Sequence, residues 1–126
     1  MCIRDRSGTI LTSPDGITWT ERTSGTSENL RGIAYGNSTF VVTGVDDTIL
    51  TSTDAVTWTI QTPPNAFTNQ LRSVIYANNQ YVVVGSGGAI ITSPDAITWT
   101  EQTSGLAVTI FDVIYANNLY VYTLEW

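Results

Sequence analysis

Three aspartates recur at matched positions of the chain, each inside a short motif that ends in tryptophan. The motif is Ser-x-Asp-(Gly/Ala)-x-Thr-Trp. Carboxylates repeated in register could bind a cation or another ligand. In a tight turn, however, a short carboxylate or hydroxyl accepts hydrogen bonds from backbone N–H groups that lack a strand partner. We therefore expect a structural role, and no metal site, for the serines, aspartates and tryptophans of the motif: Ser13, Asp15, Trp19, Ser52, Asp54, Trp58, Ser93, Asp95 and Trp99.

The motif belongs to a longer repeat. Its tryptophans lie 39 and 41 residues apart. Tyr35, Tyr76 and Tyr115 recur 41 and 39 residues apart, and each is followed five positions later by another aromatic residue. A period of about 40 to 45 residues is typical of β-propellers, in which each repeat is a four-stranded blade. We therefore expect an all-β repeat array.

One complete unit holds four short β-rich runs, Leu30 to Tyr35, Phe40 to Gly44, Thr48 to Ser52 and Thr57 to Thr62. Turn-forming residues separate successive runs, with Gly36-Asn37 and Asn78-Asn79 between the first two runs of the complete units. Middle runs such as Tyr81-Val82-Val83-Val84 are unbroken apolar segments, which indicates burial on both faces, whereas the last run mixes polar and apolar residues. These features predict a four-stranded antiparallel meander with a wetter outer strand.

The repeat divides the chain into two complete blades flanked by two half blades. The expected boundaries are 8–23 for a half blade, 30–62 and 71–103 for blades, and 111–126 for a half blade. A closed ring usually has about four to eight blades, so we expect a β-propeller fragment whose ring is not closed. Its end faces would be covered by missing blades of a longer parent chain or by self-association. Residues 1–7 break the repeat and resemble a translated adapter sequence of metagenomic reading frames, so we expect a non-native leader.

The recurring motif resembles the Asp-box, or BNR repeat, of sialidases and other bacterial propellers. The family pattern is Ser-x-Asp-x-Gly-x-Thr-Trp, and every copy here has one residue fewer between the aspartate and the tryptophan. The resemblance covers all three units. It implies that the motif lies on the rim of the propeller, away from the active site that sialidases have.

A second set of candidate residues lies near the start of the first strand of each unit. Arg31 and Arg72 occupy equivalent positions there, with Asp112 as their counterpart in the third unit. First strands of a propeller line its central channel, so these residues are candidate channel-lining ligand contacts. The alternative is that each residue simply begins a strand at the solvated rim. Asp46-Asp47 could contact a cation, but a hairpin turn explains these two carboxylates, and calcium needs further oxygen ligands.

The composition argues against catalysis and nucleic-acid binding. The five cationic residues are all arginine, the chain has no His, and its net charge is −6. The single cysteine, Cys2, lies in the suspected leader. Nucleophilic and general-base schemes therefore lack their usual residues, and the scattered arginines supply neither the cluster that binds a sialidase substrate nor a phosphate-binding surface. We expect no catalytic residues, no cofactor, no nucleic-acid partner and no membrane span.

Three function classes fit such a propeller. The first is a binding, adhesion or scaffold module of a secreted or surface bacterial or phage protein, with a protein or glycan ligand. The second is the non-catalytic part of a sialidase-like glycoside hydrolase. The third is an assembly protein resembling the photosystem II stability factor, on the strength of the repeat type. We favour the first, and the acidic, Lys-free composition favours an extracellular, cell-surface or periplasmic location.

The blade stack predicts unequal roles for equivalent tryptophans. Replacing Trp58 with alanine is expected to lower the free energy of unfolding more than replacing Trp19, because the central unit has neighbours on both sides. Truncation of a buried aromatic side chain costs about 3 to 5 kcal/mol, which denaturant titration resolves easily. Equal losses in the two variants would contradict the stack.

Overall fold

The computed structural model describes residues 8–26, 28–45, 48–61, 70–103, 105 and 107–124. These residues form short antiparallel strands joined by tight turns. The strands are β1 (Ile10–Thr12), β2 (Thr20–Arg22), β3 (Leu30–Gly36), β4 (Thr39–Gly44), β5 (Ile49–Ser52), β6 (Thr59–Gln61), β7 (Leu71–Ala77), β8 (Gln80–Gly85), β9 (Ile90–Ser93), β10 (Thr100–Gln102), β11 (Ile110–Ala116) and β12 (Leu119–Leu124), with a short 3-10 turn, η1 (Ser86–Gly88), between β8 and β9.

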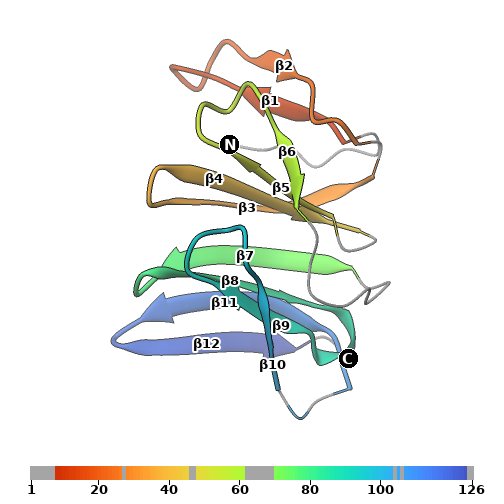
Figure 1. The fold of residues 1–126 in the computed structure, drawn as a ribbon, viewed down its shortest axis with the longest axis vertical. Coiled ribbons are helices and arrows are strands. Elements are labelled where there is room, and N and C mark those ends of the chain that lie inside the picture. The colour runs from red at the N-terminus through yellow and green to blue at the C-terminus, as the bar shows by residue number, and fades with distance from the viewer. Residues whose placement is uncertain are drawn as a thin grey trace.

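The strands form two complete blades and two half blades. Strands β3 to β6 and β7 to β10 are four-stranded meanders, and β1–β2 and β11–β12 are two-stranded sheets. The four sheets are stacked with the two-stranded sheets at opposite ends, and the first strands β3, β7 and β11 lie side by side (Figure 1). This arrangement confirms the predicted all-β fold, a β-propeller fragment of four-stranded antiparallel blades whose ring is not closed. The suspected leader, residues 1–7, and the predicted ends at 62 and 126 lie outside the described residues.

Two-residue turns join the first and second strands of each unit. Asn78 and Asn79, between β7 and β8, have φ values of 53° and 64°. Two successive positive φ angles define the type I′ turn, whose twist matches that of a hairpin and which favours asparagine. In the first complete blade the turn lies at Asn37 and Ser38, one residue beyond the predicted Gly36-Asn37, because Gly36 still pairs with Thr39.

Every first strand carries a one-residue irregularity near its start. In β3, Leu30 pairs with Gly44 and Gly32 with Thr43, so Arg31 has no direct partner on β4. The same shift skips Arg72 in β7 and Phe111 in β11. A β-bulge of this kind bends the strand and re-aims the side chain of the extra residue.

Repeated glycines at the ends of β4 and β8 accommodate a close backbone approach. A Cβ atom built on Gly44 would lie 2.2 Å from the carbonyl oxygen of Asn29, and one on Gly85 would lie 2.2 Å from that of Gln70. Any other residue at these positions would force the backbone apart. Gly44 and Gly85, which recur at matched positions of the repeat, are therefore explained by close backbone packing beside the bulge.

The core lies between the stacked sheets. In β8, Tyr81 and Val83 pack into the cluster shared with the preceding blade, while Val82 and Val84 face the half blade β11–β12. All four side chains are buried, which confirms the prediction that the middle strands are covered on both faces. The outer strands are wetter, as expected, and Ile60 on β6 is 59% exposed.

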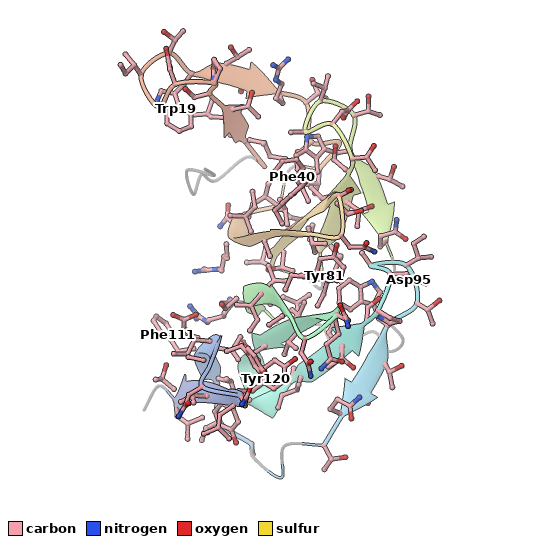
Figure 2. The ribbon with its side chains drawn as sticks, turned by 90° about the vertical axis from the view of Figure 1, so that its left-hand side faces the viewer. Trp19, Phe40, Tyr81, Asp95, Phe111 and Tyr120 are labelled. Carbon is pink, nitrogen blue, oxygen red and sulfur yellow. The ribbon has the colours of Figure 1, made fainter. Side chains whose placement is uncertain are left out.

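Tyrosine hydroxyl groups link successive units. The Tyr81 hydroxyl donates a hydrogen bond to the Gly36 carbonyl, at the end of β3 in the preceding blade. Figure 2 shows Tyr81 between the two complete blades. The Tyr120 hydroxyl, one repeat later, donates to the Ala77 carbonyl at 3.0 Å. Phe40, at the matching position of the first complete blade, has no hydroxyl. These hydrogen bonds fix the position of each sheet relative to the preceding one.

Removing the Tyr81 hydroxyl tests this link. Tyr81→Phe is expected to lower the free energy of unfolding by about 1 to 2 kcal/mol, because it leaves a buried carbonyl without its donor. Tyr76→Phe is the matched control, since that hydroxyl has no hydrogen-bond partner among the described residues. Denaturant titration of both variants gives the comparison, and equal stability of the two would contradict the link.

Candidate functional site

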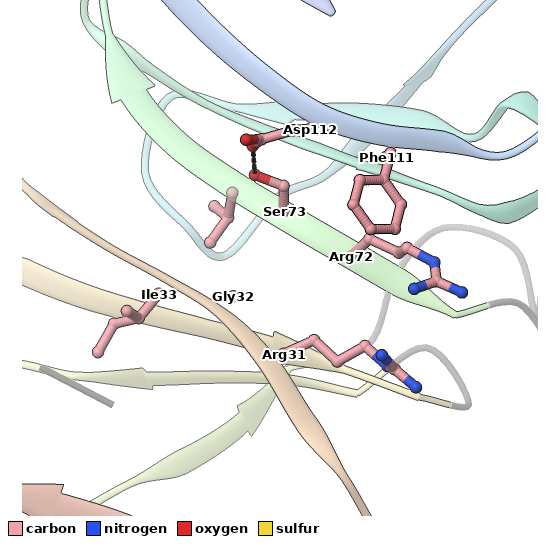
Figure 3. A pocket seen from close by; sticks show the side chains of 8 residues that line it. Arg31, Gly32, Ile33, Arg72, Ser73, Phe111 and Asp112 are labelled. Atoms are coloured by element: carbon pink, nitrogen blue, oxygen red, sulfur yellow. Dashed lines mark hydrogen bonds between the residues drawn. The ribbon is translucent and has the colours of Figure 1, made fainter. Parts of the chain in front are cut away.

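A pocket of about 310 Å³ lies along the first strands of three successive units (Figure 3). We call it the inner pocket. Strands β3, β7 and β11 each contribute the bulge residue and those that follow it. The pocket contains all three channel-lining candidates of the sequence analysis, and its lining is Arg31, Gly32, Ile33, Arg72, Ser73, Val74, Phe111 and Asp112.

The register of the three strands shows which of the pocket residues occupy equivalent positions. The bulge residue is Arg31 in β3, Arg72 in β7 and Phe111 in β11. The expectation that Asp112 is the counterpart of the two arginines is therefore wrong by one position, because Asp112 follows the bulge and corresponds to Ser73. Sequence reasoning missed Phe111, although the 39-residue interval that joins Tyr76 to Tyr115 leads from Arg72 to Phe111.

The Arg72 guanidinium is held by two contacts. Its Cζ lies 5.3 Å from the centre of the Phe111 ring, and its Nη2 donates to the Gln70 Oε1 at 3.1 Å. Its buried Nε–H has no hydrogen-bond partner among the described residues. Cation–π stacking fixes the plane of a guanidinium while leaving the edge free to donate. In Figure 3 the side chains of Arg31 and Arg72 extend toward the same side of the strands.

Asp112 is hydrogen-bonded to its surroundings and lies next to the neighbouring blade. Its Oδ1 accepts from the Ser73 hydroxyl at 2.8 Å and from the backbone N–H of Val113 at 2.9 Å. The lining thus holds two guanidinium groups and one carboxylate, which makes it locally positive in a chain of net charge −6. Glycoside hydrolysis usually needs two carboxyl groups, and the described lining supplies one. Guanidinium groups can form charge-assisted hydrogen bonds with an anionic group.

Each Ser-x-Asp motif forms a turn that we call a corner. The three corners contain the same pattern of hydrogen bonds. In the first complete blade, Asp54 Oδ1 accepts from the backbone N–H groups of Val56 and Thr57, both at 2.9 Å, and from the Ser52 hydroxyl at 3.0 Å. Ser52 Oγ in turn accepts from the Ala55 N–H at 2.7 Å. The corners around Asp15 and Asp95 repeat these contacts. That the corners serve structure alone stays a prediction.

The residue after each aspartate has a positive φ angle, 78° at Gly16, 63° at Ala55 and 65° at Ala96. Backbone N–H groups then converge on the carboxylate. They hold the pKa of all three aspartates below the ordinary value of 3.8, with the N–H three residues on contributing most. Figure 2 places Asp95 on the opposite side of the stack from Phe111, so corner and inner pocket are separate.

The corner tryptophans differ in burial. Trp99 is 6% exposed and lies 6.4 Å from the Tyr81 ring, and Trp58 is half-buried at the same distance from Phe40. Trp19 is half-buried and has no ring contact among the described residues. The greater loss expected for Trp58→Ala than for Trp19→Ala stays a prediction.

Other candidates lie outside the described part of the chain or find no support in it. Asp46, Asp47 and Cys2 are not among the described residues. Within the described ranges, no group of three or more Asp, Glu, His or Cys side chains could hold a metal ion. No helix in these ranges has the length and apolarity to cross a membrane.

Acid should weaken the corners. Because the folded-state pKa of Asp54 lies below its unfolded value, its carboxylate stabilises the fold above about pH 4 and this contribution is lost as pH falls through the folded pKa. Asp54→Asn is therefore expected to be less stable than the unmodified chain at neutral pH, with a difference that narrows in acid. Denaturant titration from about pH 7 to about pH 2 measures it, with Glu21→Gln, an exposed carboxylate on β2, as control. Parallel stability curves for Asp54→Asn and the unmodified chain would contradict it.

Comparison with known proteins bears on the fold. No protein-family model matches the chain, and no curated protein sequence matches it. A solved structure described as YCF48 bound to D1 peptide is similar, with a TM-score of 0.70 and 17% sequence identity. The match covers 82% of this chain and 36% of that chain. The chain thus spans little more than a third of the length of the structure that it matches, and at this identity the likeness shows the fold alone, a β-propeller.

Proposed function

We propose that this chain is part of a non-catalytic β-propeller that binds protein, and that its inner pocket receives an acidic side chain or terminal carboxylate of a peptide. The observation that carries the proposal is the pair of guanidinium groups, Arg31 and Arg72, that neighbouring blades bring into one pocket. Guanidinium groups form paired, charge-assisted hydrogen bonds with carboxylates. Such contacts are stronger than neutral ones.

The rest of the pocket suits a peptide. Phe111 is 47% exposed, so it offers apolar surface beside the Arg72 guanidinium. Ser73 and Asp112, already hydrogen-bonded to each other, form the polar wall of the pocket. An aromatic surface, fixed cations and a polar wall within one concave site are the usual elements of small recognition pockets. The similar propeller whose structure holds a bound peptide supports a peptide partner.

The finer assignments are proposals of the same kind. We assign the corners to the Asp-box class on their sequence, and we place the parent protein outside the cytoplasm, at the cell surface or in the periplasm, on its acidic, Lys-free composition. We propose an adhesion or scaffold role on the basis of the same peptide site. An assembly protein is the second candidate function, supported by the same peptide-bound propeller. The hydrolase alternative has the least support, because the inner pocket supplies a single carboxylate.

Charge-dependent peptide binding tests the proposal. A fluorescein-labelled hexaglutamate peptide is expected to bind the unmodified chain in fluorescence anisotropy, and hexaglutamine is not. Arg72→Gln should weaken binding at least about tenfold, since a hydrogen bond to a charged group is worth about 1.5 to 3 kcal/mol and about 1.4 kcal/mol is a factor of ten. Arg22→Gln on β2 is the matched control, because Arg22 donates to Thr12 outside the inner pocket. Equal binding of the two peptides, or no effect of Arg72→Gln, would count against an acidic ligand.

A further inference from the structure

A second pocket, of about 260 Å³, lies between the corners of the two complete blades. We call it the rim groove. Strands β4, β5 and β6 and the Asp54 corner form one side, and the Asp95 corner of the next blade forms the other. In Figure 2 Asp95 lies on the opposite side of the stack from Phe111, so the groove is separate from the inner pocket. We propose that the rim groove binds a neutral saccharide, a ligand distinct from the peptide proposed for the inner pocket.

Hydroxyl groups dominate the lining of the rim groove. The first blade contributes the threonines Thr39, Thr51, Thr53, Thr57 and Thr59. The Gln61 side-chain amide donates to Thr51 Oγ1 at 3.0 Å, so among the described residues the hydrogen of the Thr51 hydroxyl is left to donate to a ligand. A hydroxyl group both donates and accepts a hydrogen bond. A surface built from such groups therefore matches a ligand that is itself covered with hydroxyl groups.

Two fixed carboxylates, Asp54 and Asp95, also line the rim groove. Within the described part of the chain, each accepts its hydrogen bonds through Oδ1 alone. The Oδ2 atom of each remains available to accept from a ligand hydroxyl, and such a charge-assisted hydrogen bond is stronger than a neutral one. Because the described lining contains these two carboxylates and no cationic side chain, it disfavours an acidic ligand.

Ile97 adds an apolar surface to this polar groove. Its side chain is 65% exposed, so its place in the lining is not explained by burial in the core. A sugar ring has hydroxyl groups around its edge and C–H groups on its faces. It can therefore pack a C–H face on Ile97 while its edge bonds to the hydroxyl groups and carboxylates. A lysine side chain would satisfy the carboxylates but would leave most of the hydroxyl groups without a ligand, which is why we favour a saccharide.

The two sides of the groove are held together by the fold. Ala96, next to Asp95, is 1% exposed and packs in a core cluster that contains Val41 of the preceding blade. The Tyr81 hydroxyl lies 3.4 Å from the carbonyl oxygen of Thr39, which lines the groove. These contacts fix the second corner against the first blade. A site formed before the ligand arrives loses less conformational freedom on binding.

A glycan array tests the proposal. The labelled chain is expected to bind immobilised neutral oligosaccharides of glucose, mannose or galactose in preference to sialylated or sulfated ones. Ile97→Ser and Thr59→Val should each weaken this binding at least about threefold, because the first removes the apolar contact and the second removes a hydroxyl group. Ile17→Ser and Thr100→Val are the matched controls, since these exposed residues hold the same repeat positions outside the groove and should leave binding unchanged.

One further variant separates the rim groove from the inner pocket. Arg72→Gln, expected to weaken acidic-peptide binding, should leave binding of neutral oligosaccharides unchanged, so the two sites succeed or fail independently. A labelled hexalysine peptide tests for a cationic ligand on the same variants. Failure to bind any neutral oligosaccharide on the array, or equal effects of Ile97→Ser and Ile17→Ser, would overturn the saccharide site. So would weaker binding of hexalysine, and not of oligosaccharide, by Ile97→Ser and Thr59→Val.

Discussion

Burial of both faces of each sheet is the constraint on which the rest of this structure depends. Val82 and Val83 are adjacent on β8 and point to opposite faces, yet both are buried because a neighbouring sheet covers each face. A blade therefore cannot be stable alone, and the sheets must stack. Stacking in turn brings the first strands β3, β7 and β11 side by side. The inner pocket is therefore a consequence of the burial of the apolar sheet faces.

Local features were the ones that the sequence could predict. The strands follow from apolar runs between turn residues, and the fold class follows from the repeat length. The corner contacts join residues within three positions of each other, such as Asp54 and Thr57, so they need no information from elsewhere in the chain. The polar character of the corner is visible in a single copy of the motif for that reason.

The inner pocket could be predicted only in part, because it depends on a feature without a residue signature. Arg31 and Arg72 stood out by type and position, but the bulge that precedes Gly32, Ser73 and Asp112 adds one residue to each first strand. Comparing polar residues alone then aligned Asp112 with the arginines. Phe111 was missed because an aromatic residue in a β-rich run is usually expected in the hydrophobic core. Its side chain is exposed because the bulge redirects it.

The repeat itself separates scaffold from candidate site. At the corners one chemistry recurs in every unit, with Asp15, Asp54 and Asp95 at equivalent positions. At the bulge the three units differ, with arginine in two and phenylalanine in the third, and the next position holds glycine, serine or aspartate. Because stacked blades place equivalent residues next to each other, different side chains at one repeat position produce an asymmetric surface on a symmetric frame. Variation among equivalent positions therefore directs attention to the inner pocket, whereas the uniform corners fit the structural role that we predict for them.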